Sequence, residues 1–155
     1  MNLFLRLFYV LAASVFRPRL PAGQAISELM LLTLPNDLDI NLHVNNGRYL
    51  TLCDLNRVDL FIRSGLAGVM FKRGWMPIIA EHTMNYRKPL GVFKRFKATM
   101  HLTHWDEKHF YMTHQFSINE KIIAECTSKG VVRGREGVIA PAEVIAAIIA
   151  ARGAA

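Results

Sequence analysis

The densest group of chemically capable side chains lies between Asn36 and Tyr49, in a turn-rich segment that leads into a helical pattern. It contains two carboxylates, Asp37 and Asp39, the imidazole of His43, and several amides. The start of a helix offers free backbone N–H groups and the positive end of the helix dipole, which can hold a developing oxyanion. A carboxylate beside it can attack a carbonyl or deprotonate a water. The segment therefore has the groups needed to hydrolyse an ester or thioester.

The same residue types also serve purely structural purposes. Asp and Asn side chains often accept hydrogen bonds from the backbone in turns and at helix starts. On this interpretation Asn45 and Asn46 begin the helix, and Asp37 holds the end of the preceding strand. His43 would then be a partly buried histidine without a part in catalysis. The residue types alone leave both interpretations open.

Apolar periodicity and turn residues indicate the elements that position this segment. A strong helix is predicted over residues 47–63, with Asn45 or Asn46 as its N-cap and Ser64-Gly65 at its end. Alternation between turns predicts strands over 26–34, 76–88, 94–105, 109–118 and 121–133. A closing helix is predicted over 141–151, beginning at Pro141.

The order of these elements indicates the fold. An antiparallel sheet must bury its apolar face against another layer, and the helix over 47–63 is long and apolar enough to cover it. We therefore expect an α+β hotdog fold, in which a curved antiparallel sheet wraps around one long central helix. An additional apolar N-terminal helix and a linker would occupy residues 1–20, and the hotdog domain residues 21–155.

A longer motif supports this interpretation. The pattern Asp37-x-Asp39, Asn41-x-His43-x-Asn45-Asn46 and Tyr49 resembles the signature of the hotdog acyl-thioesterases, which include the 4-hydroxybenzoyl-CoA and the plant acyl-carrier-protein types. The nearest resemblance is to small bacterial and animal thioesterase-superfamily proteins that also start with an apolar segment. It covers most of the chain from Leu34 onward and includes Asp54, Arg57-Val58-Asp59-Leu60, Trp105-Asp106-Glu107 and Arg133-Gly134-Arg135. The resemblance implies a hotdog thioesterase domain and an acyl-CoA thioesterase activity.

The resemblance also implies roles for individual residues. Asp39 matches the nucleophile or general base of the benzoyl-CoA branch, whereas Asn41 and His43 match an Asn and a His of the plant carrier-protein branch. The chain combines both patterns, so the choice between nucleophile and general base stays open. Backbone N–H groups around residues 46–48 would hold the oxyanion. We expect the substrate to be bound by Asn45, Asn46, Gly47, Arg48 and Tyr49, and the fold implies a homodimer or a dimer of dimers with the site at the interface.

Charge indicates an anionic partner. Lys and Arg number 19 against 12 acidic residues, which gives a formal charge of +7. We expect Arg87 and Lys88 to bind the phosphates of coenzyme A or the acidic surface of a carrier protein, although they could also be a solvated face. Coenzyme A would be part of the substrate, and no other cofactor, no metal and no nucleic acid is expected. Cys53 and Cys126 are predicted to be buried apolar residues in a reducing compartment.

The apolar segment over residues 1–16 allows three interpretations. Sixteen helical residues rise about 24 Å, less than the roughly 30 Å of a hydrocarbon core. The segment is either an anchor at a membrane surface with Arg17 and Arg19 at headgroup level, a helix docked on the domain or its dimer partner, or a signal cleaved after Ala12-Ala13-Ser14. We accordingly expect a cytoplasmic protein that is either free or peripheral at the inner face of a membrane.

Two further carboxylates and two other functions remain as alternatives. Asp54 on the predicted helix and Glu81 in a predicted strand lie where some hotdog thioesterases carry a catalytic carboxylate. The chain could instead be a hotdog dehydratase or hydratase, which the Asp-x-Asn-x-His run fits less well. It could also be a membrane-associated acyl- or lipid-binding protein without catalysis.

Overall fold

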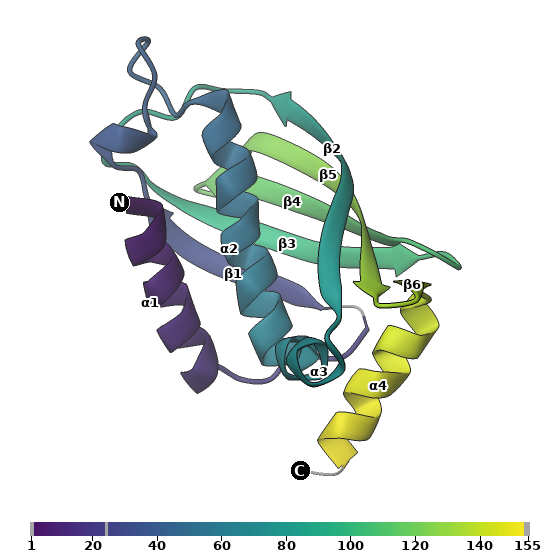
Figure 1. The fold of residues 1–155 in the computed structure, drawn as a ribbon. Helices are drawn as coiled ribbons and strands as arrows, with labels where there is room; N and C mark the ends of the chain where they lie inside the picture. The colour runs from purple at the N-terminus through teal and green to yellow at the C-terminus, as the bar shows by residue number, and fades with distance from the viewer. Residues whose placement is uncertain (1, 24, 154–155) are drawn as a thin grey trace.

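The computed structural model describes residues 2–23 and 25–153, and in this part of the chain a six-stranded antiparallel sheet is covered by four α-helices (Figure 1). The helices are α1 (Asn2–Phe16), α2 (Asn46–Ser64), α3 (Leu66–Arg73) and α4 (Pro141–Gly153), and a 3₁₀ turn, η1, spans Pro35–Asp37. The strands are β1 (Ile26–Leu32), β2 (Met76–Tyr86), β3 (Arg95–Trp105), β4 (Phe110–Ile118), β5 (Lys121–Gly134) and β6 (Gly137–Ile139).

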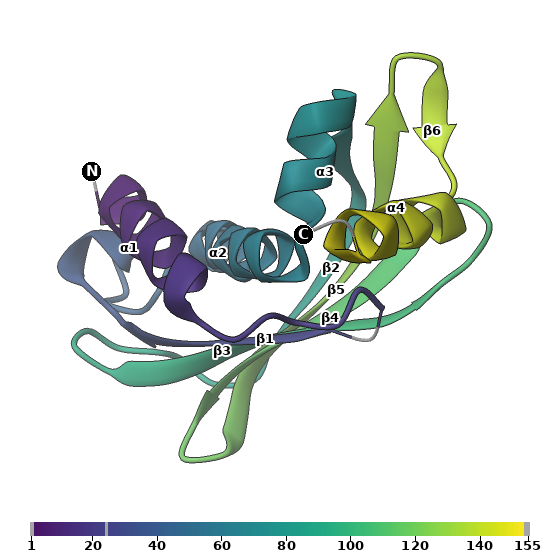
Figure 2. The ribbon, with the colours of Figure 1, turned by 90° about the horizontal axis from the view of Figure 1, so that it is seen from below.

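The sheet has the strand order β1-β3-β4-β5-β2, with β6 paired to the end of β5. The short turns between β3, β4 and β5 make them neighbours, as expected of a meander. On β3 the buried positions alternate, so Phe96, Ala98, Met100 and Leu102 face the helices. Figure 2 shows all four helices on one side of the curved sheet. This arrangement is the predicted α+β hotdog fold, with α2 as its central helix.

Helix α2 lies across the hollow of the sheet and has buried residues on more than one of its sides. Leu52, Cys53 and Leu55 are completely or almost completely buried against the sheet, where they meet Cys126 of β5. The expected start and end of this helix are confirmed: Asn45 is its N-cap, and Gly65 ends it with φ at 83°, a conformation that glycine adopts without strain. The cysteines are buried and unpaired, as predicted.

Three short elements were not predicted from the sequence. These are η1, α3 and β6, which have 3, 8 and 3 residues. Each is too short to show a periodic pattern of its own, and α3 is separated from α2 only by Gly65. The predicted long elements are all present, with ends displaced by one or two residues in most cases.

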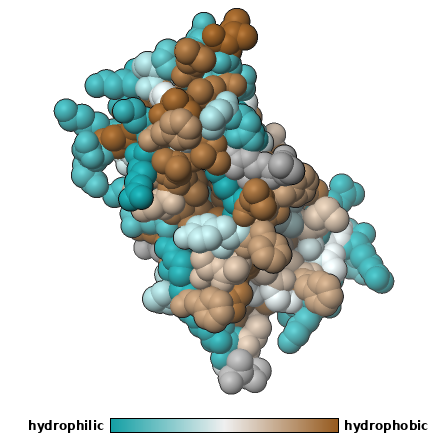
Figure 3. All heavy atoms as spheres, turned by 90° about the vertical axis from the view of Figure 1, so that its left-hand side faces the viewer, coloured by the Kyte–Doolittle hydropathy of each residue, from teal (hydrophilic) through white to brown (hydrophobic). Residues whose placement is uncertain are grey.

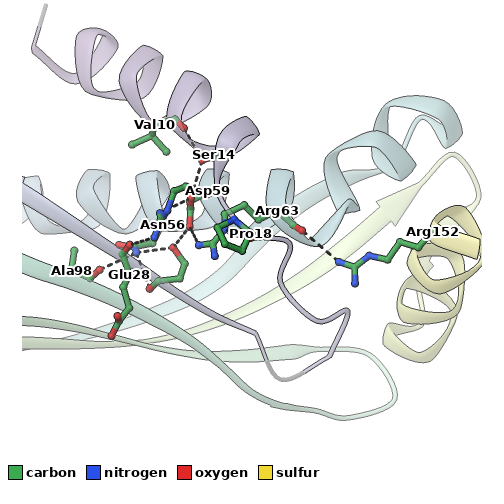
Figure 4. Close-up of polar contacts among 11 residues, drawn as sticks. Val10, Ser14, Pro18, Glu28, Asn56, Asp59, Arg63, Ala98 and Arg152 are labelled. Carbon is green, nitrogen blue, oxygen red and sulfur yellow. Dashed lines mark hydrogen bonds and ion pairs between the residues drawn. The ribbon is translucent and has the colours of Figure 1, made fainter. Parts of the chain in front are cut away.

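Helix α1 is docked on α2, and one buried carboxylate holds it there (Figure 4). Asp59 of α2 accepts hydrogen bonds from Ser14 in the last turn of α1 and from Arg17 directly after it, at 2.8 and 2.9 Å. Its second oxygen accepts from Ser27 of β1 and Arg63 of α2, at 2.7 and 2.9 Å. Asp59 thus joins α1, β1 and α2 at a point that water does not reach. Three interpretations of the apolar N-terminal segment were open from the sequence. The contacts of Asp59 agree with the second of them, a helix docked on the domain.

Candidate active site

The loop between η1 and α2 closes on itself through its backbone. Leu38 and Val44 form an antiparallel bridge, and inside it the Asp39 N–H donates to the His43 carbonyl at 2.9 Å. The Leu42 N–H donates back to the Asp39 carbonyl at 3.1 Å, with φ of Leu42 at 59°. The Asp39 carboxylate accepts from the Asn41 N–H at 2.9 Å. This Asx-type turn, which Asp forms readily, fixes the carboxylate within its own loop.

The base of the loop is held by the other carboxylate, Asp37. It is buried and accepts from the Leu34 N–H, from both terminal nitrogens of Arg6 on α1, and from Nε of Arg48 on α2. Its role is therefore the structural one considered from the sequence, with the addition of two ion pairs. Arg48 turns toward Asp37 and the Asn36 carbonyl, which lie at the base of the loop.

The start of α2 presents its amides to this loop. The side chain of Asn45 accepts from the Gly47 N–H at 2.9 Å, and the Asn45 carbonyl accepts from the Arg48 N–H at 2.8 Å. Within the described part of the chain, the Asn46 N–H is the one of these three amides without an acceptor. A free N–H at a helix start, on the positive end of the dipole, is suited to an oxyanion.

Seven of the ten predicted site residues line one cleft of about 360 Å³. The cleft is formed by Asp39, Asn41, His43, Val44, Asn46, Tyr49, Tyr86, Arg87, Lys88, Pro89 and Leu90. The structure thus brings the Asp39 loop, the start of α2 and the end of β2 together. The other three predicted residues, Asn45, Gly47 and Arg48, lie beside the cleft, where they cap the helix or bind Asp37.

Two tyrosines form the inner wall of the cleft. Tyr49 is buried, and its ring lies 5.5 Å from that of Tyr86. Burial and the neighbouring Tyr86 raise the pKa of Tyr49 to about 12. The Tyr86 hydroxyl donates to the Asn46 carbonyl at 2.9 Å and so ties β2 to the start of α2. Tyr86 was missed in the sequence, where its place directly before Arg87-Lys88 was the only signal.

The cations of the cleft differ in how far they are neutralised. Arg87 forms an ion pair with Glu125 at 2.9 Å. Lys88 has no ion pair among the residues that the structure describes. Lys88 is therefore the cation better placed to receive an anionic group of a ligand.

The two alternative carboxylates lie outside this cleft. Asp54 is largely exposed and pairs with Arg57, which in turn contacts Ser128 and lies 3.5 Å from His82. Glu81 is exposed on β2 and lines a separate hollow with Tyr111 and Lys129. Over residues 2–23 and 25–153, no three His, Cys, Asp or Glu side chains gather as they would around a metal ion.

Comparison with known proteins places the chain in a family. The model of the thioesterase-like superfamily matches residues 33–149. Protein THEM6 of Xenopus laevis is 39% identical over 85 residues, which are 55% of this chain and 41% of the relative, so the match spans less than half of that protein. A probable thioesterase, YbaW of Escherichia coli, has a similar structure, with a TM-score of 0.73, 18% identity, and coverage of 79% of this chain and 96% of YbaW.

A 1,4-dihydroxy-2-naphthoyl-CoA thioesterase from Synechocystis is also similar in structure, with a TM-score of 0.67 and 12% identity over 78% of this chain and 95% of the other. At such identities the two solved structures establish the shared hotdog fold. The family match covers most of the chain and includes the Asp39 loop, α2 and the whole sheet apart from β1. The chain belongs to the thioesterase-like superfamily.

Proposed function

We propose that the chain hydrolyses an acyl-CoA thioester, with Asp39 as the catalytic carboxylate. The observation that carries this proposal is the shared cleft, in which the Asp39 carboxylate and the free Asn46 N–H both belong to the lining. A carboxylate base and an oxyanion donor on one small cavity are the two components that thioester hydrolysis requires. Membership of the thioesterase-like superfamily supports the same class of reaction.

The reaction follows from the positions of these groups. The thioester carbonyl points its oxygen at the Asn46 N–H, which polarises it. Asp39 takes a proton from a water molecule as the water oxygen bonds to the carbonyl carbon. The tetrahedral intermediate then collapses, the carbon–sulfur bond breaks, and the leaving thiolate takes up the proton. The Asn41 N–H keeps the Asp39 carboxylate in place, and the exposed His43 ring orients the water from the rim of the cleft.

Coenzyme A is the preferred carrier because its phosphates match the cations at the cleft. Lys88 is free to bind a phosphate, and Arg87 lies next to it at the end of β2. The similar Synechocystis protein is a thioesterase for a CoA thioester. A carrier protein would use the same cations through an acidic surface, so both carriers belong in the assay.

A second copy of the chain is expected to complete the site. Strand β2 is an edge of the sheet, and its 11 residues leave one row of backbone groups unpaired. Its last residue, Tyr86, lines the cleft. Pairing of β2 with a partner strand would place the partner beside the cleft, as a homodimer or a dimer of dimers requires.

The test is release of free thiol from a panel of acyl-CoAs and acyl-carrier proteins, followed with a thiol-reactive dye. Asp39→Asn should lower kcat about 100- to 10,000-fold, the usual contribution of a general base, and should leave folding intact because the carboxylate is bound only within its own loop.

Asp54→Asn is the control, since that carboxylate lies outside the cleft, and it should retain more than half of the turnover. If Asp39→Asn turns over as fast as the parent protein, Asp39 is not the catalytic group. If only Asp54→Asn loses activity, the catalytic carboxylate is Asp54 of α2. Saturable acyl-CoA binding without any thiol release would instead identify a binding protein.

A further inference from the structure

One side of α1 carries large apolar side chains that no other part of the described structure covers. They are Phe4, Leu5, Phe8, Tyr9, Leu11, Val15 and Phe16, with exposures from 39% to 89%. These positions recur at spacings of one, three and four residues, so most of them form a continuous stripe along the helix. Figure 3, which faces this side of the molecule, shows a band of hydrophobic atoms flanked by hydrophilic ones.

The stripe is separate from the face by which α1 is docked. Val10 and Ser14 are buried against α2, and Ser14 donates to Asp59 (Figure 4). Arg6 binds Asp37 at the other end of the helix. Both ends of α1 are therefore held by buried carboxylates, which presents the apolar stripe outward in one fixed orientation. A stripe of this kind in water is costly, and it indicates an apolar partner.

The charges at the end of α1 indicate the chemistry of that partner. The chain continues from Phe16 through Arg17 to Arg19, and Arg19 lines a cleft of about 250 Å³. The other charged residues of this cleft are Arg63, Lys72 and Arg152, and no carboxylate lines it. Among the described residues, Arg19 and Lys72 form no ion pair. An apolar helix face that ends near two cations without ion pairs is complementary to an anionic lipid surface.

We propose that the outward stripe of α1 rests on an anionic lipid bilayer, with Arg19 and Lys72 at the level of the headgroups. The described helices include none that is long and apolar enough to cross a membrane. A second copy of the chain would suit the stripe less well. It would bring the same cations to this face, and α1 has no carboxylate to meet them.

The inference is tested by sedimenting the protein with vesicles of phosphatidylcholine, alone or mixed with phosphatidylglycerol. The protein should bind the mixed vesicles more strongly, and salt should weaken that binding. The double variant Phe8→Asp/Val15→Asp should lower the bound fraction at least about tenfold, because two apolar contacts are replaced by charges that the lipid repels. Lys72→Glu should reduce binding to the mixed vesicles more than to the neutral ones.

Val138→Asp is the matched control. Val138 is an exposed valine on β6, on the opposite side of the molecule from α1 in Figure 1, and its substitution should leave vesicle binding unchanged. Equal binding by the double variant and the parent protein would overturn the proposal, and so would a parent protein that stays in solution with both kinds of vesicle. In the latter case, a drop in molar mass caused by the double variant would show that a second copy covers the stripe.

The experiment is independent of the proposed hydrolysis. None of the substituted residues lines the Asp39 cleft, so thiol release from a soluble short-chain acyl-CoA should be the same in the double variant and the parent protein. Vesicle binding with no hydrolysis, or hydrolysis with no vesicle binding, would each refute one proposal and leave the other standing.

Discussion

Replacing Asp59 by Asn should destabilise the domain strongly. The Asp59 side chain is fully buried, and each of its oxygens accepts one hydroxyl and one guanidinium hydrogen bond. The amide of Asn keeps one accepting oxygen and turns an NH₂ group toward two donors. The substitution thus removes two hydrogen bonds and both ion pairs, and it leaves the Arg63 guanidinium buried without an opposite charge.

The magnitude follows from that count. Removing one partner of a buried ion pair costs about 3–5 kcal/mol, against a total of about 5–15 kcal/mol for a domain. At about 2–4 °C per kcal/mol for a chain of this size, the melting temperature should fall by about 6–20 °C. Because Ser14 lies in the last turn of α1 and Arg17 directly follows it, the amide protons of α1 should exchange with solvent faster in the variant than in the parent protein.

The assay is equilibrium unfolding in urea at pH 7, together with hydrogen exchange resolved by segment. The control is Glu120→Gln, since the Glu120 side chain is 85% exposed and pairs with Lys97 at 3.1 Å. An exposed pair of this kind contributes at most about 1 kcal/mol. If Asp59→Asn loses no more than Glu120→Gln, or if α1 exchanges as slowly as before, Asp59 does not hold α1 in place.

Two further substitutions probe the packing beneath α2. His114→Leu should stabilise the domain by about 1–2 kcal/mol at pH 7, because both ring nitrogens of His114 are buried without hydrogen-bond partners. Burial, and to a lesser extent the neighbouring Arg57 and His82, lower the pKa of His114 to about 3. Below about pH 6.5 the unfolded chain therefore binds a proton at His114 that the folded chain does not bind, and the parent protein should lose stability as the pH falls. Between pH 7 and pH 5, the free energy of unfolding measured in urea should fall less for His114→Leu than for the parent protein, and an equal fall would contradict this prediction. Gly130→Ala should cost about 1–3 kcal/mol, since the added Cβ would lie 3.2 Å from the Ile78 carbonyl oxygen and 3.3 Å from Met112. The control is Gly91→Ala, whose Cβ would meet nothing within 4 Å. Equal melting temperatures of the two variants would refute the prediction.

The sequence by itself determined the fold and the place of the candidate site. Periodicity is a local property, so α2 and the five long strands could be predicted together with the Asn45 cap and the Gly65 end. The run from Asp37 to Asn46 concentrates carboxylates and amides before a helix, and this local chemistry indicated the loop, whereas the resemblance to the hotdog thioesterases indicated Asp39 within it. The roles of the candidate residues stay predictions that the proposed substitutions test.

Only the tertiary structure decided which distant residues meet. Tyr86 and Lys88 lie beside the Asp39 loop because β2 ends next to the start of α2. The spacing of these residues along the chain does not indicate that they are close in space. The same holds for Asp59, whose partners lie up to 45 residues away, and for α1, whose sequence fitted an anchor, a docked helix or a signal. A sequence pattern shows that a side chain is apolar or charged, whereas the packing of α1 on α2 decides which of its faces is buried and which is left to meet a partner.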